Sequence, residues 1–150
     1  METFNRILVS SHSGWRWIVL ILLLVAVVKM HAGWKGKKTF TEGSRKLALF
    51  TMIAFHLQFL FGWILYFSSS KVAFFDGMMK DALYRFFTVE HSLMMTIAMV
   101  LITIGHSKSK KKENDTAKFK TIAVFYTIAL VLILAAIPWP FRTALGAGWF

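Results

Sequence analysis

The sequence predicts an all-α integral membrane protein: an antiparallel four-helix bundle with both termini outside, on the periplasmic side. Three observations predict this fold. Hydrophobic residues make up 57% of the 150-residue chain, and the mean hydropathy is +0.58, which is too apolar for an ordinary soluble domain. The apolar residues gather in four segments that lack the alternating pattern of barrel strands. Positive charge is concentrated in two loops between these segments.

The four expected spans belong to a single domain, residues 1–150. The first apolar run, from Trp15 to Met30, is extended back through Ile7 because a helix needs about 20 residues to cross a bilayer. Pro138 and Pro140 end the last span, because proline cannot continue a helix. The approximate spans are residues 7–30, 47–67, 84–105 and 119–137.

The loop charges predict the orientation and a class of partner. Loops 29–46 and 106–120 are strongly basic, whereas loop 68–83 has balanced charges. The positive-inside rule places both basic loops in the cytoplasm. The net charge of +11 therefore reflects the orientation of the loops in the membrane. The lipid bilayer is the expected partner. Nucleic acid is not an expected partner, because the basic loops lie in no recognisable nucleic-acid-binding module.

Ionisable residues inside the third span are the strongest functional signal. Residues 86–106 carry Glu90, His91 and His106. Ionisable groups within a bilayer are costly and are usually retained for function. Histidines also lie in or beside other apolar segments, at positions 12, 31 and 56, and the chain has no cysteine. This pattern excludes disulfides and thiolate sites and indicates a metal or haem held by imidazole.

Helix geometry gives each histidine an approximate depth. At 1.5 Å per residue, His56 lies roughly 13 Å, His91 about 22 Å and His12 about 27 Å above the inner boundary. We therefore expect His12 and His91, carried by adjacent antiparallel helices, to face a common pocket. His31 and His106 fall at the inner edge beside lysines, where a structural or interfacial role is expected.

Three further charged residues are expected near this pocket. Arg16 falls close to the height of Glu90 and His91. It can snorkel to the interface, or pair with Glu90 or a haem propionate through bidentate hydrogen bonds. We predict that Arg16, Arg85 and Glu90 form one charged cluster beside the cofactor, which would tie the first span to the third.

Four motifs resemble a family. They are His12 to Trp17 (HSGWRW), His56 to Gly62 (HLQFLFG), Arg85 to His91 (RFFTVEH) and Ile137 to Arg142 (IPWPFR). Together they resemble small bacterial four-helix membrane proteins labelled "cytochrome B", over essentially the whole chain. The resemblance implies haem b ligated by two of His12, His56 and His91, with Arg16, Arg85 and Glu90 at recurring charged positions.

The resemblance also implies a role and a location. The expected function is electron transfer in the bacterial cytoplasmic (inner) membrane, to or from quinone or as a subunit of a respiratory assembly.

Two other interpretations stay open at this stage. His12, His56, His91 and Glu90 would together bind Zn, Cu or Fe. Alternatively, the chain is a cofactor-free structural or accessory subunit of a membrane complex, in which histidine and glutamate hydrogen-bond between helices.

Overall fold

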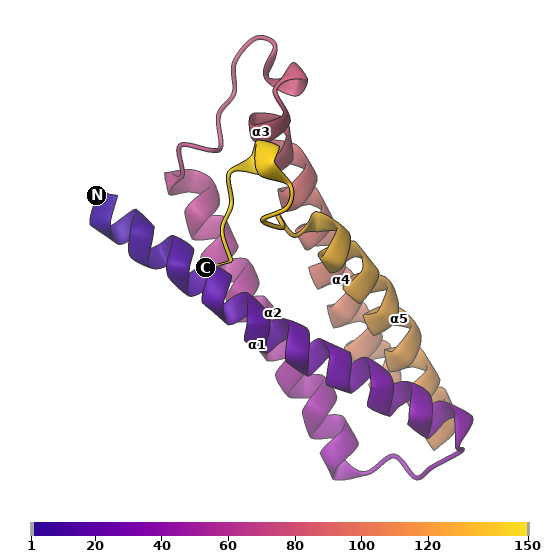
Figure 1. The fold of residues 1–150 in the computed structure, drawn as a ribbon. Helices are drawn as coiled ribbons and strands as arrows, with labels where there is room; N and C mark the ends of the chain where they lie inside the picture. The colour runs from indigo at the N-terminus through magenta and orange to yellow at the C-terminus, as the bar shows by residue number, and fades with distance from the viewer. Residues whose placement is uncertain (1, 150) are drawn as a thin grey trace.

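The computed structural model describes residues 2–149 and confirms an all-helical fold with four long helical spans (Figure 1). No strand occurs in these residues. The spans are α1 (Glu2–Lys35), α2 (Glu42–Ser68), a third made of α3 (Ala82–Arg85), the π-helix η2 (Phe86–Glu90) and α4 (His91–Lys110), and α5 (Asp115–Ala136). Short 3-10 turns are η1 (Met78–Lys80) and η3 (Thr143–Leu145). All four spans are long and apolar enough to cross a membrane.

The helices begin and end at residues suited to those positions. Thr41, Asp81 and Asn114 each accept a hydrogen bond from a backbone N–H of the first turn that follows, which satisfies a donor that has no partner within the helix. α5 ends at Ala136, just before Pro138 and Pro140. Most helices extend several residues past the predicted spans, because they continue beyond the apolar stretch that a bilayer covers.

The spans form a four-cornered bundle. α1 packs on α2 and α5, and α4 packs on the same two helices. Because successive spans run in opposite directions, α1 and α4 are diagonal in the bundle and run the same way (Figure 1). Side chains from α1 and α4 can therefore meet only across the interior of the bundle.

Small residues lie inside the bundle and large apolar residues lie outside. Fully buried alanines line the helix contacts at positions 26, 48, 98, 123, 129 and 136. Large aliphatic side chains such as Ile21, Val28 and Val131 are about 61% exposed. Without a hydrophobic driving force in lipid, helices associate by close packing, and small residues allow that approach. The outer surface is suited to lipid rather than water.

The third span contains a π turn that the sequence analysis did not predict. Over Phe86–Glu90 the backbone makes i→i+5 hydrogen bonds, and the N–H of His91 donates to the carbonyl of Phe86. A π turn inserts one extra residue and rotates everything that follows relative to a regular helix. Its position immediately before His91 therefore sets the direction in which that histidine points.

The segment after α5 folds back over one end of the bundle. It passes η3, beside α3, and returns toward α1 (yellow in Figure 1). Arg142 lies over the ring of Phe86, 4.5 Å from its centre. Trp17 stacks on Trp149 at 6.1 Å and meets Trp139 at 6.3 Å. These contacts hold the C-terminal segment against α1 and the third span.

Replacing Gly105 by alanine should destabilise the protein. A Cβ at Gly105 would lie 2.5 Å from Cβ of Phe125, so α4 and α5 would have to separate. We expect a loss of about 1–3 kcal/mol in the free energy of unfolding, measured by thermal unfolding in detergent. Gly14→Ala is the control, because a Cβ there meets nothing within 4 Å. Equal stability of the two variants would contradict this packing.

Candidate functional site

α1 and α2 diverge from α4 at the end of the bundle that carries both termini (Figure 1). A cavity of about 570 Å³ is lined by residues of these helices. The C-terminal segment, at Gly146 to Gly148, forms one of its walls. Its inner part is apolar, lined by Val19, Leu20, Phe55, Phe59, Met95 and Ile133. Its outer part is polar. An apolar cavity with a few convergent polar groups is the usual form of a ligand site.

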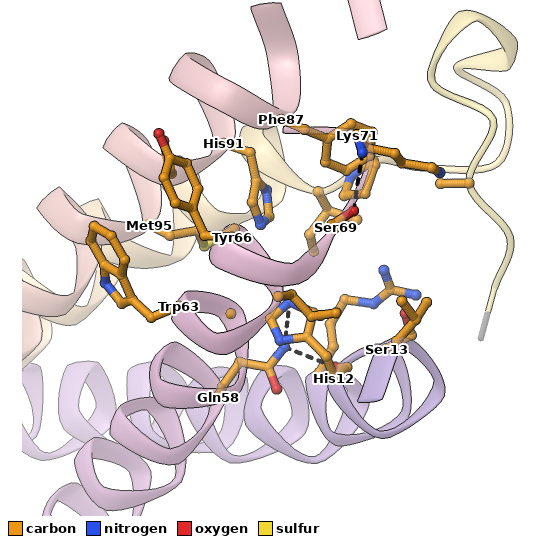
Figure 2. A pocket seen from close by; sticks show the side chains of 18 of the residues that line it. His12, Ser13, Gln58, Trp63, Tyr66, Ser69, Lys71, Phe87, His91 and Met95 are labelled. Atoms are coloured by element: carbon orange, nitrogen blue, oxygen red, sulfur yellow. Dashed lines mark hydrogen bonds between the residues drawn. The ribbon is translucent and has the colours of Figure 1, made fainter. Parts of the chain in front are cut away.

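His12 of α1 and His91 of α4 face each other across this cavity (Figure 2). Their ring centres are 6.4 Å apart and their planes are inclined by 75°. The sequence analysis expected the two rings at a common pocket, but on adjacent antiparallel helices. That arrangement is corrected, because α1 and α4 are diagonal and parallel.

The ring of His91 is held by a carbonyl that helix α5 leaves free. Its Nδ1–H donates to the carbonyl oxygen of Ala136 at 2.7 Å. In a continuing helix that carbonyl would accept from residue 140, which here is Pro140 and has no N–H. In neutral His91 the proton is therefore on Nδ1, and Nε2 carries the lone pair that can bind a metal.

His12 is held from α2. The amide nitrogen of Gln58 donates to the backbone carbonyl of His12 at 2.8 Å and lies 3.3 Å from its Nε2. Nδ1 of His12 and Oε1 of Gln58 are buried without a hydrogen-bond partner among the described residues. A Cβ at Gly62 would lie 3.2 Å from Cε1 of His12, so glycine leaves room for the ring. The free nitrogen of His12 is Nδ1, and either imidazole nitrogen can bind a metal.

The outer part of the cavity is cationic. Arg6, Arg16 and Lys71 line it, and no aspartate or glutamate does so among the described residues. Arg16 is only 8% exposed, and its Nε has no hydrogen-bond partner within residues 2–149. Lys71 donates to the carbonyl of Gly146 at 3.0 Å, and burial lowers the pKa of its ammonium. An anionic group at this position would be attracted by three positive charges.

The predicted charged cluster forms only in part. Arg85 and Glu90 make an ion pair at 2.7 Å, but both belong to the third span and neither lines the cavity. Arg16 does not join them. It donates instead to the carbonyl of Trp149 at 2.7 Å. The expectation that this cluster ties the first span to the third is therefore wrong. α1 is joined to the C-terminal segment instead.

His56 lies apart from the other two candidate ligands. Its Nδ1 donates to the carbonyl of Met52 at 2.7 Å, and its Nε2 lies 3.2 Å from the hydroxyl of Thr103. It does not line the cavity. Among the described residues, no three histidine, aspartate or glutamate side chains come together as a metal site. A Zn, Cu or Fe site made by His12, His56, His91 and Glu90 together is therefore not formed here.

Sequence reasoning missed four parts of this site: Arg6, Gln58, Lys71 and the Gly146–Gly148 backbone. Gln58 is a polar residue in the middle of an apolar span, a signal that would have identified it. Lys71 and the Gly146–Gly148 backbone gave no such signal, because loop residues reach the cavity only through the tertiary fold.

No family model, curated protein or solved structure matches this chain.

Loss of the Arg16 guanidinium should loosen the C-terminal segment. In Arg16→Leu we expect amide hydrogen exchange of residues 143–149 to rise by about tenfold, because a charge-assisted hydrogen bond is lost. Arg6→Leu is the matched control, since Arg6 lines the same cavity but makes no hydrogen bond to this segment among the described residues. Mass spectrometry of peptides from this segment gives the measurement. Unchanged exchange in Arg16→Leu would show that the aromatic contacts alone hold the segment.

Proposed function

We propose that this chain is a membrane electron-transfer protein that holds haem b between His12 and His91. The observation that carries the proposal is the pair of imidazoles facing each other across an amphipathic cavity at 6.4 Å. Two rings bonded to opposite sides of one metal ion, each through a nitrogen–metal bond of about 2.0 Å, have their centres roughly 6 Å apart. The observed separation fits that geometry.

The surroundings of the two rings support the same ligand. The Ala136 carbonyl fixes the tautomer and orientation of His91, as outer partners of metal-binding histidines commonly do. For His12 to bind through Nδ1, its proton must be on Nε2, which lies 3.3 Å from the amide nitrogen of Gln58. The Gln58 amide would then turn to present Oε1 as the acceptor, and it would give up its 2.8 Å hydrogen bond to the His12 carbonyl.

The polarity of the cavity also matches a haem. Its apolar inner part suits the porphyrin ring, and Arg6, Arg16 and Lys71 stand where carboxylates of a ligand would need counter-charges. Arginine binds a carboxylate in bidentate fashion. In the described structure Arg16 and Lys71 instead donate to carbonyls of the C-terminal segment. Ligand carboxylates would replace or share those acceptors.

Electron transfer is the reaction class that this arrangement favours. When bound, haem supplies a one-electron redox couple whose potential depends on its axial ligands and on burial. His12 and His91 would both hold the iron, which would suit haem to exchanging electrons rather than to binding a substrate. The protein residues orient the rings and exclude water. Quinone and the other subunits of a respiratory assembly are the proposed redox partners, in the bacterial cytoplasmic membrane.

Histidine substitutions test the proposal. We expect the purified protein to give a positive pyridine haemochrome assay. His12→Ala and His91→Ala should each lose the bis-histidine reduced-minus-oxidised spectrum, and most of the bound haem. His56→Ala is the matched control and should keep the spectrum, because His56 lies outside the cavity. Arg16→Leu should weaken haem binding or shift the midpoint potential, with Arg16→Lys intermediate.

Two outcomes would contradict the proposal. One is full haem retention in either His12→Ala or His91→Ala. The other is a purified wild-type chain that takes up no haem. The second outcome would favour a cofactor-free accessory subunit, in which these histidines only join helices.

Cysteine labelling tests the proposed orientation, with both termini on the periplasmic side. The chain has no cysteine of its own, so a single introduced thiol gives no background. Asp76→Cys and Lys112→Cys place thiols at exposed positions near opposite ends of the bundle. An impermeant maleimide should label Asp76→Cys in intact spheroplasts, and Lys112→Cys only after lysis. The reverse pattern would invert the orientation, and labelling of both in spheroplasts would contradict the fold.

A further inference from the structure

A second cavity lies at the opposite end of the bundle, far from the His12–His91 site. Its volume is about 290 Å³. It lies between the start of α2, the end of α4 and the start of α5. The residues that line it are Phe40, Thr41, Glu42, Arg45, Ala48, His106, Ser109, Lys110, Lys118 and Ile122. It belongs to no part of the proposed haem site.

His106 is the residue of this cavity whose polar side-chain atoms lack hydrogen-bond partners within residues 2–149. The residue is only 3% exposed, and neither of its ring nitrogens has a hydrogen-bond partner among the described residues. The sequence analysis expected a histidine with a structural or interfacial role here. A buried imidazole always presents at least one N–H donor, and leaving it unpaired is costly. One explanation for such a group is a bound species that satisfies it.

The charges around His106 define the chemistry of that species. Three cations line the cavity, Arg45, Lys110 and Lys118, against one carboxylate, Glu42. Arg45 binds Glu42 through two hydrogen bonds, of 2.7 and 2.5 Å, so the charges of these two residues offset each other. Lys118 lies 3.4 Å from Asp115, a carboxylate that does not line the cavity. Lys110 makes no ion pair among the described residues, so the net charge of the lining is positive and favours an anion.

The helix terminus contributes little to the site. Thr41 already caps α2 by accepting from the N–H of Ser44. The positive end of the α2 dipole adds to the field, but the receptor is the set of side chains formed by His106, Arg45 and Lys110.

We propose that this cavity binds a phosphate group through His106, Arg45 and Lys110. A phosphate has several oxygens, so one group can accept from the imidazole N–H and from two cations together. The cavity is several times the volume of one water, about 30 Å³, and it lies at the basic end of a membrane bundle. Basic pockets between membrane helices in such positions accommodate anionic lipid headgroups. The phosphate belongs either to an anionic phospholipid or to free inorganic phosphate.

Ligand-dependent thermal stability of the whole chain in neutral detergent tests the proposal. We expect phosphatidylglycerol, inorganic phosphate or both to raise the unfolding midpoint in a saturable manner, and phosphatidylcholine to leave it unchanged. A response to inorganic phosphate identifies a free anion site. A response to phosphatidylglycerol alone identifies a lipid headgroup site.

Variants locate the response. Arg45→Gln and Lys110→Gln should raise the half-saturating ligand concentration at least tenfold. Lys112→Gln is the control, because Lys112 is exposed at the same end but does not line the cavity. His106→Leu should abolish the response while keeping or raising stability without ligand, since it removes an unpaired polar group. A merely structural His106 would instead destabilise the ligand-free protein when replaced.

Three results would overturn the proposal: no response to either ligand, an equal response to phosphatidylcholine, or an equal loss in Lys112→Gln. If His106→Leu fails to fold, the comparison of Arg45→Gln and Lys110→Gln with Lys112→Gln tests the proposal without it. Haem content is not used in any of these measurements, so failure of the His12–His91 proposal leaves this test intact.

Discussion

The need to pair every polar group inside an apolar bundle governs this structure. No water reaches the hydrocarbon core of a bilayer, so hydrogen bonds must be made within the protein. Several threonine hydroxyl groups in the spans solve this locally by donating to the carbonyl four residues earlier in the same helix. Thr51, Thr96, Thr103, Thr121 and Thr127 all do so. Polar residues are thereby accommodated without a partner helix, and they do not by themselves define a site.

A few polar side chains instead join two helices. Trp15 donates to the carbonyl of Ala54, and Tyr126 donates to the carbonyl of Ala48. Both acceptors lie on α2, so α2 is bonded to α1 and, across the interior, to α5. Small residues at these positions let the helices approach closely enough for such bonds. Ala48 and Ala54 therefore contribute both to the close packing of the helices and to the hydrogen bonds between them.

The exceptions to complete pairing fall in two places. Among the described residues, five buried side-chain atoms have no hydrogen-bond partner. Three of them, on His12, Arg16 and Gln58, line the larger cavity, and the two ring nitrogens of His106 line the smaller. The other buried polar side-chain atoms of the described residues have hydrogen-bond partners, so these two groups of unpaired atoms call for an explanation. The two proposals above place a ligand beside each group of atoms: a haem at one end and a phosphate group at the other.

The sequence by itself determined the four spans, because apolar runs of membrane length and paired prolines are local properties. It also determined that His12 and His91 lie at similar depth, since helical rise is constant. It did not determine their relation across the bundle, which follows from the diagonal placement of α1 and α4. Nor did it show the π turn that aims His91, because i→i+5 bonding leaves no clear pattern in the residues.

Only the tertiary structure decided which charged and polar residues belong together. Arg16 was expected beside Glu90 because the two have similar depth, but depth leaves the direction around the helix open, and Arg16 reaches the C-terminal segment instead. His56 shares the residue type of the candidate ligands, yet its own helix and Thr103 engage both of its nitrogens. His106 looked interfacial by position and is buried. The sequence determines the depth of a residue along its helix, whereas the rotation and packing of the helices determine which residues it contacts.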